Sequence, residues 1–424
     1  MTNSLSSYLN KFAEQETHLH RLTTAKTYQS VLVVPVFQES LSCLEGLLNN
    51  ARHSTLLILV ANAPPENILD TQEFVSGIQR QYPPIWVNQH LSLHNYEGQQ
   101  DILLVDRCRD DTTIPKKQGV GLARKVGADI AASLIQQGIV ESSWICTTDA
   151  DVRLPPDYFS HSTAPTAGLS ARIYPFQHRA DPSIALASKL YDVSLHYYVE
   201  GLRWSGSPYA FHTIGSTLAI HYQKYAAVRG FPKRSAGEDF YLLNKLAKVG
   251  DIECLDAPVL DIEARLSDRT PFGTGHALQK ISQLSRPVDE YLYYNPVIFS
   301  LLRDWLSVIP EIWSHRDEVD LDFLCKNATN NKQILKTGLQ ASGVLPMLLK
   351  GIKQYRSMAT FSRYVTHWFD AFRTLKLIHY LRDNHFASVP LKEIMAAPFI
   401  TNIDTELQHS MFDLISQTHY HYPP

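Results

Sequence analysis

The sequence predicts an α/β domain with a mostly parallel sheet flanked by helices, followed by a helical C-terminal region. Short unbroken runs of aliphatic residues, such as residues 31–36, are typical of strands that are buried on both faces. Apolar residues at helical spacing follow these runs, which is the alternation of an α/β fold. Helical periodicity prevails near the C-terminus. We therefore expect a lead-in over residues 1–28, an α/β domain over residues 29–285 and a helical region over residues 286–424.

Four strands are expected in the α/β domain because each is a short apolar run. They cover residues 31–36, 56–60, 102–105 and 144–148. Parallel strands of this kind are joined by helices that cover the faces of the sheet.

One helix is expected directly after the first strand, from apolar residues at helical spacing over residues 41–51, and three more are expected from apolar spacing and from their terminal residues. The first of these three has one apolar face through residues 126–134 and is ended by Gly138. The second begins with Asp181 as N-cap and a proline after it, and Gly201 stands where a C-cap glycine is expected. The third is expected to start near Ser235 and to run to residue 250.

Composition limits the classes of function. The 424 residues include 39 Lys or Arg and 42 Asp or Glu, a formal charge of −3, so no excess of positive charge is present to bind nucleic acid. Five cysteines without a C-x-x-C pair suit a reducing compartment. The first residues have no signal-peptide core, and no apolar stretch reaches the roughly 20 residues of a membrane-spanning helix. We expect a soluble cytoplasmic protein without a transmembrane segment.

Asp149-Ala150-Asp151 comes directly after the strand expected at residues 144–148. Ligands bind outside the carboxyl ends of the strands in open α/β sheets. Two carboxylates at this edge can share Mg²⁺ or Mn²⁺, because these cations take oxygen ligands and bind substrate phosphates. An isolated D-x-D is also common in Asx-turns, in which each Asp caps a backbone amide. The motif alone leaves both interpretations open.

Gly237-Glu238-Asp239 begins the helix expected after Ser235. Ser235 and Glu238 have the spacing of a capping box, and the helix dipole favours acidic residues in a first turn. A capping box leaves Asp239 without a structural role. A carboxylate at a helix N-terminus stays ionised, as a general base must. A structural and a catalytic interpretation are equally compatible with this motif alone.

Four segments with this chemistry occur in a recognisable order. They are residues 35–39 (P-V-F-Q-E), residues 149–151 (D-A-D), residues 215–231 with G-S-T-L-A-I and R-G-F, and residues 237–239 (G-E-D). The series resembles the family 2 glycosyltransferases of the GT-A fold over roughly residues 30–255. The resemblance implies an inverting, metal-dependent hexosyltransferase that moves a sugar from a nucleotide-sugar donor to an acceptor hydroxyl. Processive synthases of that family carry a Q-x-x-R-W motif and membrane helices, which this chain lacks, so single transfer is favoured.

The resemblance also implies a role for each matching residue. Residues of the donor site are Pro35, Val36, Glu39, Asn62, Arg124 and Asp149. Asp149 and Asp151 hold Mn²⁺ or Mg²⁺, which binds the donor diphosphate. Asp239 is the general base for the acceptor hydroxyl, and Glu238 supports it.

The chain departs from the family pattern at three places. An A-N-A sequence replaces an aspartate-containing turn after the second strand, so Asn62 can hydrogen-bond a base or ribose but not as an anion. Lys125 replaces the asparagine that follows the family's arginine, here Arg124. Arg265 and Arg269 lie in the region of the missing Q-x-x-R-W motif, and they either bind phosphate or acceptor or belong to a solvated loop.

Two more side chains are candidates with a structural alternative. His276 is a candidate third metal ligand, although a lone histidine beside glycine is more often structural. Trp204 is a candidate for stacking on an acceptor sugar, and packing in the core is the simpler account.

The C-terminal region alternates cationic and aromatic side chains over residues 350–382. This mixture suits peripheral contact with an anionic membrane surface, at the inner face and near a lipid-linked acceptor. It also suits an amphipathic bundle that packs on the catalytic domain, and Asp370 and Asp383 favour this second interpretation because they dilute the charge. The sequence does not identify the acceptor, which is a saccharide, a lipid-linked molecule or a small molecule.

Two other functions stay open. One is a non-catalytic nucleotide-sugar-binding protein on the same scaffold, against which the intact Asp149, Asp151 and Asp239 argue. The other is a sugar nucleotidyltransferase. That enzyme needs a glycine-rich phosphate loop directly after the first strand, and residues 35–46 contain only Gly46.

Overall fold

The computed structural model describes residues 2–19, 26–48, 54–109, 112–163, 167–267, 269 and 273–421. The chain forms two compact units: Met1–Ala180 with Thr213–His276, and Asp181–His212 with Ala277–Pro424. The sequence predicted a single boundary at residue 285, whereas in the structure residues 181–212 belong to the second unit together with the C-terminal residues.

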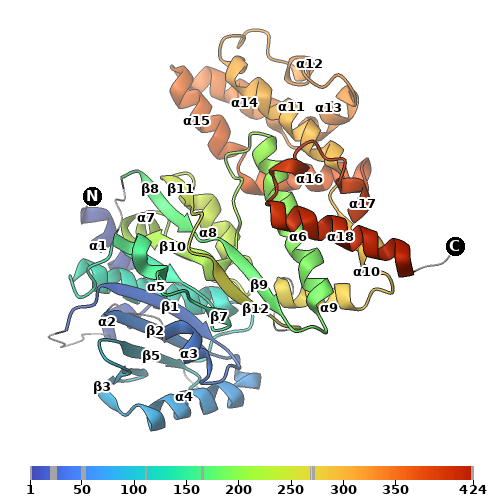
Figure 1. Ribbon diagram of the computed structural model, residues 1–424. Coiled ribbons are helices and arrows are strands. Elements are labelled where there is room, and N and C mark those ends of the chain that lie inside the picture. Colours follow the sequence, from blue (N-terminus) through green and yellow to red (C-terminus); the bar gives the residue numbers. More distant parts are fainter. Residues whose placement is uncertain are drawn as a thin grey trace. The chain divides into compact units, whose positions relative to one another are not determined.

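The first unit is built on a sheet of nine described strands in the order β11-β8-β10-β6-β1-β2-β5-β4-β3 (Figure 1). The central strands β6, β1, β2 and β5 are parallel, whereas β10, β4 and β3 pair antiparallel with their neighbours. The predicted α/β class with a parallel centre is confirmed, and the antiparallel flanks were not predicted. The strands are β1 (Ser30–Val36), β2 (Thr55–Asn62), β3 (Pro84–Asn88), β4 (Leu91–Asn95), β5 (Asp101–Arg107), β6 (Trp144–Thr147), β8 (Leu169–Ile173), β10 (Leu218–His221) and β11 (Asp251–Cys254).

The core of this unit lies around the four central strands. Every residue of β1, β2, β5 and β6 is buried, as their unbroken apolar runs predict. Val33 pairs with Ile58 of β2 and with Thr147 of β6. Because these strands are parallel, their carboxyl ends meet at one edge of the sheet.

A smaller sheet lies at that edge, and its three strands are hydrogen-bonded in the spatial order β7-β12-β9. It consists of β7 (Val152–Arg153), β12 (Leu260–Ala264) and β9 (Phe176–Ala180). The carbonyl of Asp151 accepts a hydrogen bond of 2.9 Å from the Glu263 N–H. The loop after β6 is therefore fastened to the segment that leads to Arg265.

Helices pack on the large sheet, and the longest of them is α5. Its Gly127 lies against β1 and β2, where a Cβ would be 2.4 Å from the Val33 side chain. Gly138 follows α5 with φ of 72°, as the predicted helix end requires. The helical elements are α1 (Thr2–Lys11), α2 (Glu16–Leu19), α3 (Cys43–Leu48), η1 (Pro65–Asn67), α4 (Leu69–Gln81), α5 (Gly119–Gln136), η2 (Tyr158–Thr163), η3 (Gly215–Thr217), α7 (Tyr222–Ala227), α8 (Glu238–Leu246) and the start of α9 (Thr274–Ser282).

The N-terminal lead-in is part of this packing, because α1 delivers Tyr8 to a buried polar cluster. Tyr8 and Tyr225 both donate to Oδ1 of Asp129, at 2.5 and 2.8 Å. Lys125 donates to Oδ2 of Asp129 and to the Tyr8 hydroxyl, both at 2.8 Å. The Glu14 N–H donates to the same carboxylate. Burial raises the pKa of Asp129, and the Lys125 ammonium opposes this effect.

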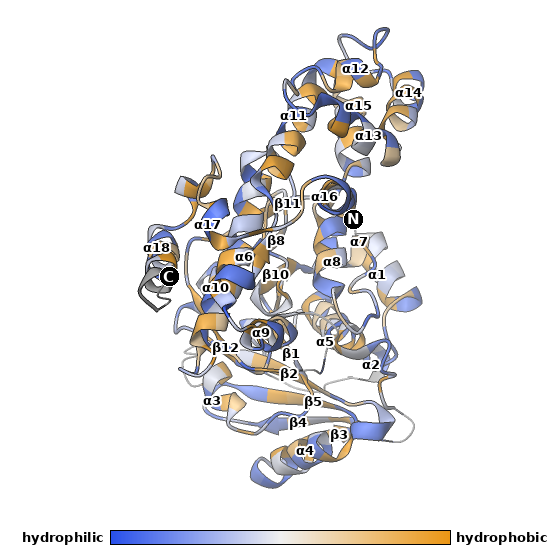
Figure 2. Ribbon diagram, turned by 90° about the vertical axis from the view of Figure 1, so that its right-hand side faces the viewer, coloured by the Kyte–Doolittle hydropathy of each residue, from blue (hydrophilic) through white to orange (hydrophobic). Residues whose placement is uncertain are grey.

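The second unit is almost entirely helical in its described part. Its helices begin with side-chain caps where the sequence offers them: Asn295 accepts from the Val297 N–H and Asp370 from the Arg373 N–H. Figure 2 shows hydrophobic and hydrophilic residues alternating along these helices, as expected when one face is buried. The elements are α6 (Ala185–Trp204), α10 (Pro287–Glu290), β13 (Leu292–Tyr293), α11 (Pro296–Ile312), α12 (Leu321–Leu324), α13 (Lys332–Ala341), α14 (Val344–Gln354), α15 (Met358–Trp368), α16 (Ala371–Asn384), β14 (Val389–Pro390), α17 (Leu391–Ile394), η4 (Ile400–Asn402) and α18 (Thr405–His421).

None of the helices in the described part of the chain combines the length and the apolar character needed to cross a membrane.

Two predicted helix ends are wrong, and both belong to α6. Gly201 is not a C-cap but lies inside the helix, because its missing side chain lets Phe299 pack against the backbone; a Cβ would lie 2.6 Å from that ring. Asp181 does not cap the helix. Its carboxylate accepts from the N–H and the hydroxyl of Ser183 in a turn, and the helix begins at Ala185.

Candidate functional site

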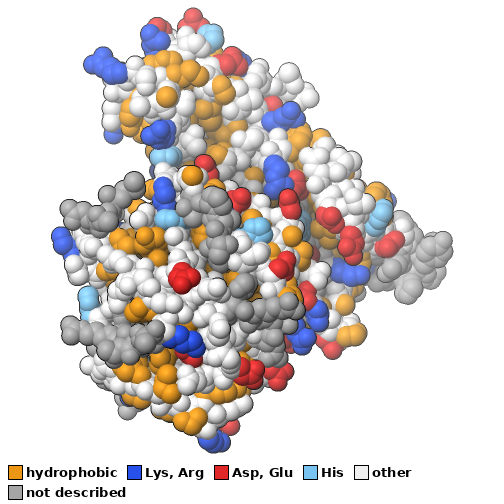
Figure 3. Space-filling model, turned by 60° about the vertical axis from the view of Figure 1, so that its left-hand side comes forward, with side chains coloured by type: hydrophobic (Ala, Val, Ile, Leu, Met, Phe, Trp, Pro, Cys, Tyr) orange, Lys and Arg blue, Asp and Glu red, His pale blue; other side chains and the backbone are white. Residues whose placement is uncertain are grey.

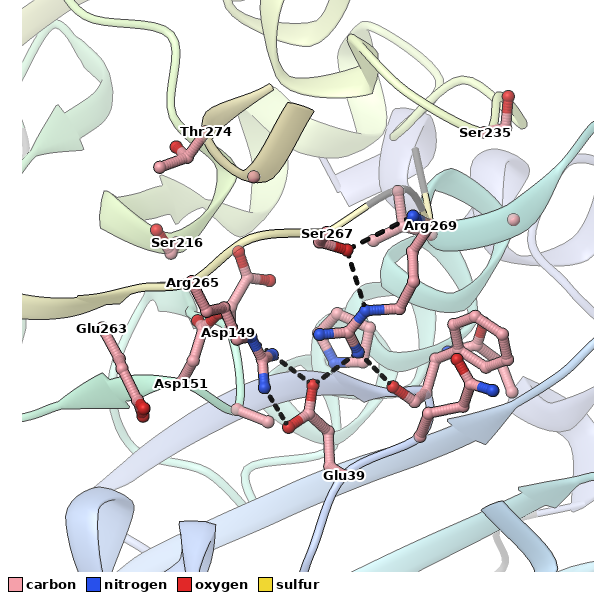
Figure 4. Close-up of a pocket in the computed structure, with 18 of the residues that line it drawn as sticks. Glu39, Asp149, Asp151, Ser216, Ser235, Glu263, Arg265, Ser267, Arg269 and Thr274 are labelled. Atoms are coloured by element: carbon pink, nitrogen blue, oxygen red, sulfur yellow. Dashed lines mark hydrogen bonds and ion pairs between the residues drawn. The ribbon is translucent and has the colours of Figure 1, made fainter. Parts of the chain in front are cut away.

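A cavity of about 590 Å³ opens at the carboxyl ends of β1, β2 and β6. Pro35 lines it from β1, Asn62 from the end of β2, and Asp149 and Asp151 from the loop after β6 (Figure 4). Ser216 lines it from η3. Three of the four segments that carry the family resemblance therefore meet at one cavity.

Glu39 is held in this cavity by two arginines that follow β12. Arg265 donates from both terminal nitrogens to the Glu39 carboxylate, with Nη1–Oε2 at 2.9 Å and Nη2–Oε1 at 2.5 Å. Arg269 Nη1 donates to Oε1 of Glu39 at 2.9 Å and to the Phe37 carbonyl at 2.6 Å. Figure 4 shows these contacts as dashed lines across the cavity floor. Both guanidinium groups are thus fixed at the lining, where an anionic ligand can reach them.

Asp151 shares one of these arginines. Its Oδ2 lies 3.1 Å from Arg265 Nη2. Burial and the nearby charge of Asp149 raise the pKa of Asp151 to about 6, and Arg265 opposes them. The carboxylate is therefore largely ionised at neutral pH.

Arg124 is buried beneath the cavity and bridges two carboxylates from distant segments. Its Nη2 donates to Asp149 Oδ1 at 2.6 Å, and its Nε donates to Glu238 Oε1 at 2.9 Å. A Cβ on Gly215 would lie 2.6 Å from the guanidinium, so only glycine permits this approach. Arg124 therefore joins the D-A-D loop to the start of α8, and it does not line the cavity itself.

The predicted capping box at Ser235 is wrong. The helix begins at Glu238, and its N-cap is Gly237, which adopts the left-handed conformation with φ of 71°. The Glu238 carboxylate is turned toward Arg124 rather than toward the helix N-terminus. Ser235 lies in the cavity lining instead.

The acidic pair at the start of α8 has raised pKa values. Burial and the charge of Asp239 raise the pKa of Glu238 to about 7, and Arg124 opposes them. Burial likewise raises the pKa of Asp239, opposed by Arg124 and by the Phe240 N–H, which donates to Oδ1 at 2.7 Å. The ionising effect expected from the helix N-terminus is thus outweighed by burial. A carboxylate with a pKa nearer to neutrality is a better proton acceptor once ionised.

The D-A-D carboxylates have oxygens free to take a cation. Within the described residues, Asp149 is bonded only through Oδ1 and Asp151 only through Oδ2. One or two carboxylates together with substrate phosphates are the usual ligand set of Mg²⁺. No group of three or more His, Cys, Asp or Glu among the described residues is arranged to hold a metal by itself.

The charge of the lining is also compatible with a cation. More carboxylates than cationic side chains line the cavity. The five carboxylates are Glu39, Glu66, Asp149, Asp151 and Glu263, and the three cationic side chains are Lys116, Arg265 and Arg269. An anionic ligand such as a diphosphate binds more favourably here if it brings a divalent cation, because the lining alone is net negative. The residues present therefore fit the metal that the family resemblance implies.

Several predicted site residues lie outside the lining. Val36 is fully buried behind it, and its carbonyl accepts a 3.1 Å hydrogen bond from the Asn62 amide. His276 lies in α9, one residue after the lining ends at Gly275. Trp204 belongs to the second unit, where it packs on the Phe399 ring. Glu238 bonds to Arg124, and neither Glu238 nor Asp239 is among the residues that line the cavity.

Some lining residues were not singled out from the sequence. They include Lys116 in the charged loop before α5, Glu263 on β12 and Thr274 at the start of α9. Glu263 had a detectable signal, because L-D-I-E-A alternates as a half-buried strand does. Lys116 had none, since loop residues carry no periodicity, and Thr274 had none because it is only the first residue of its helix.

Comparison with known proteins gives only distant similarity. No protein-family model matches the chain, and no curated protein matches it. Among solved structures, residues 1–349 of S. aureus TarS in complex with UDP-GlcNAc are 11% identical with a TM-score of 0.34, over 92% of this chain and 87% of that chain. The same TarS fragment without ligand is 11% identical with a TM-score of 0.34, over 80% of this chain and 90% of that chain. The fragment in complex with UDP is 10% identical with a TM-score of 0.33, over 80% of this chain and 89% of that chain. Similarity at this level is too low to inform the fold or the function of this chain.

Proposed function

We propose that the protein is a glycosyltransferase that moves a sugar from a nucleoside-diphosphate donor to an acceptor hydroxyl. One observation carries the proposal: segments separated by up to about 240 positions in the chain converge on a single cavity at the carboxyl edge of the sheet. They supply a pair of carboxylates at Asp149 and Asp151 and two fixed guanidinium groups, and Arg124 connects Asp149 to the acidic pair at the start of α8.

Each of these groups has a part in the proposed reaction. Asp149 and Asp151 would hold a divalent cation, which would supply positive charge to the donor diphosphate. Arg265 and Arg269 donate to phosphate oxygens and stabilise the leaving diphosphate as its negative charge increases. These arginines enter the site already oriented by Glu39, so little entropy is lost when phosphate binds.

Asp239 acts as the general base. It removes the proton of the acceptor hydroxyl while that oxygen forms a bond to the anomeric carbon and the bond to the diphosphate oxygen breaks. A single displacement of this kind inverts the anomeric configuration. Glu238 and Arg124 keep Asp239 and Asp149 at a fixed separation, since Arg124 bonds to Glu238 and Asp149 together.

Calorimetric titration with UDP, GDP, ADP and TDP tests the donor site. We expect one diphosphate to bind with Mn²⁺ present and to lose most of its affinity in EDTA. Asp151→Asn should remove the metal-dependent part of binding, whereas Glu141→Gln, a similar change at an exposed position, should not. Equal affinity for the diphosphate with Mn²⁺ and with EDTA would refute the metal assignment.

Asp239→Asn tests the catalytic role. A transferase should lose at least 10²-fold in turnover and keep its donor affinity, as is usual when a general base is removed. A protein that binds donors without catalysis would show the same donor affinity and no turnover in either form. Hydrolysis of a panel of nucleotide sugars supplies the turnover readout, because it needs no identified acceptor.

A further inference from the structure

The second unit contains a long stretch without acidic residues. Residues 323–369 hold seven Lys or Arg and neither Asp nor Glu, whereas acidic residues outnumber Lys and Arg in the whole chain, 42 to 39. Three of the seven have acidic partners outside the stretch: Lys326 pairs with Glu311, and Lys332 and Lys336 share Asp322.

The other four cations have no acidic partner within the described residues. They are Lys350, Lys353, Arg356 and Arg363, and all four are exposed. Asp370 and Asp383, which dilute the charge in the sequence, lie in or at α16 and pair with other groups: Asp370 caps that helix, and Asp383 bonds to Arg382. The excess of positive charge is thus confined to α14, α15 and their connection.

The buried and exposed residues of α14 lie on opposite faces of the helix. Its buried residues are Val344, Met347, Leu348 and Gly351, at spacings of three and four. The residues at 346, 349, 350 and 353 are all exposed and follow the same spacing. Leu349, Lys350 and Lys353 therefore share the outward face. The exposed row continues through residues 356–360 into the first turn of α15.

Two large apolar side chains lie among these cations. Leu349 is 40% exposed and Met358 is 50% exposed. Neither is needed to hold the helices together, because α14 and α15 meet elsewhere: a Cβ on Gly351 would lie 2.6 Å from the Tyr364 ring, and Phe361 is fully buried. Figure 3 shows hydrophobic side chains with Lys, Arg and some acidic side chains around them on the upper part of the displayed face, where Figure 1 draws α11 to α15.

We propose that this surface, the basic tip, binds an anionic lipid bilayer; it consists of Leu349, Lys350, Lys353, Arg356 and Met358. The cationic side chains contact lipid phosphates, and the two apolar side chains enter the boundary between headgroups and acyl chains. The inference is independent of the proposed function, because it concerns only the second unit.

A bilayer explains both parts of the surface. A soluble polyanion such as RNA would account for the unpaired cations, but it has no apolar layer that an exposed Leu and Met could enter. A bilayer surface supplies anionic headgroups and an apolar layer directly below them. The exposed pair and the unpaired cations therefore favour lipid as the partner.

Co-sedimentation of the full-length chain with vesicles tests this inference. We expect binding to vesicles that are one third phosphatidylglycerol and two thirds phosphatidylcholine, and none to pure phosphatidylcholine. Lys350→Gln with Lys353→Gln should weaken the partition coefficient roughly 25-fold, at about fivefold for each cation removed. Arg80→Gln with Lys392→Gln makes the same change in net charge at exposed positions elsewhere and should have little effect.

The apolar residues separate a bilayer from a soluble polyanion. Leu349→Ser with Met358→Ser should weaken vesicle binding roughly tenfold, since apolar side chains no longer enter the acyl boundary. Leu69→Ser, at a position that is 78% exposed in the first unit, is the matched control. No binding to anionic vesicles would overturn the proposal. So would binding that depends on the two lysines but not on Leu349 and Met358, or tighter binding to RNA than to vesicles with the same dependence on those lysines.

Discussion

Replacing Glu238 by glutamine should change how the stability of the first unit depends on pH. Burial and Asp239 raise the pKa of Glu238 from its ordinary value of 4.5 to about 7 in the folded protein. The folded state therefore holds the proton more tightly than the unfolded state does. The stabilisation that follows is fully present below pH 4.5 and is lost as the pH rises through 7.

The size of the effect follows from the two pKa values. The difference between the ordinary pKa of 4.5 and the pKa of about 7 in the folded protein corresponds to about 3 kcal/mol, because one pKa unit is worth about 1.4 kcal/mol. The amide that replaces the carboxyl group cannot titrate, so the free energy of unfolding of wild type minus that of Glu238→Gln should fall by about 3 kcal/mol between roughly pH 4.5 and 8. The attraction between Arg124 and the ionised Glu238 is already contained in the pKa of about 7, so it adds no separate pH-dependent contribution.

The difference in unfolding free energy can be measured by urea titration at several pH values, with amide hydrogen exchange as the readout of unfolding. Peptides from β1 and β6 should be used, because they report on the first unit and not on the helical one. Glu141→Gln serves as the control at an exposed position. A difference between wild type and Glu238→Gln that stays flat across this pH range would refute the assignment of a raised pKa to Glu238.

Three more substitutions test packing and charge. Gly127→Ala should destabilise the first unit by about 1–3 kcal/mol, because the new Cβ would lie 2.4 Å from the Val33 side chain; urea unfolding measures the loss. Gly201→Ala should destabilise the second unit by about the same 1–3 kcal/mol, because the new Cβ would contact the Phe299 ring; hydrogen exchange of peptides from α6 during thermal unfolding of the whole protein measures the loss. Arg265→Lys should weaken nucleoside-diphosphate binding about tenfold in calorimetry, because Lys cannot make a two-pronged contact, while unfolding changes by less than about 1 kcal/mol.

Much of the parallel core could be predicted because its signal is local. The strands at residues 31–36 and 56–60 are unbroken apolar runs, and the structure buries all of β1 and β2. The helix end at Gly138 was also predictable, since a left-handed residue after a helix favours glycine. The antiparallel strand β10 was not predicted, because Leu218–His221 is too short to show a period of its own.

The candidate site was predicted in its residue types but not in its connections. Arg124 was expected to bind donor, yet it bonds to Asp149 and Glu238, which lie 25 and 114 positions away in the chain. Arg265 likewise bonds to Glu39 across 226 positions. Ion pairs over such separations leave no pattern in a single sequence. The capping box predicted at Ser235 was wrong even though its local sequence pattern was complete. The helix begins later, at Glu238, because Gly237 takes the N-cap position in a left-handed conformation.

The buried cluster around Asp129 decides where this protein can be shortened. The apolar pattern alone would start the folded domain at residue 29, just before β1. A chain cut there would lose the Tyr8 hydroxyl and the Glu14 N–H, and would leave Asp129 and Lys125 facing a newly opened surface. Lys125 is the next residue after Arg124, so the cut would open the packing of α5 one residue away from the anchor of the acidic pair. Boundaries for shorter versions are therefore better drawn from buried polar partners than from the first strand.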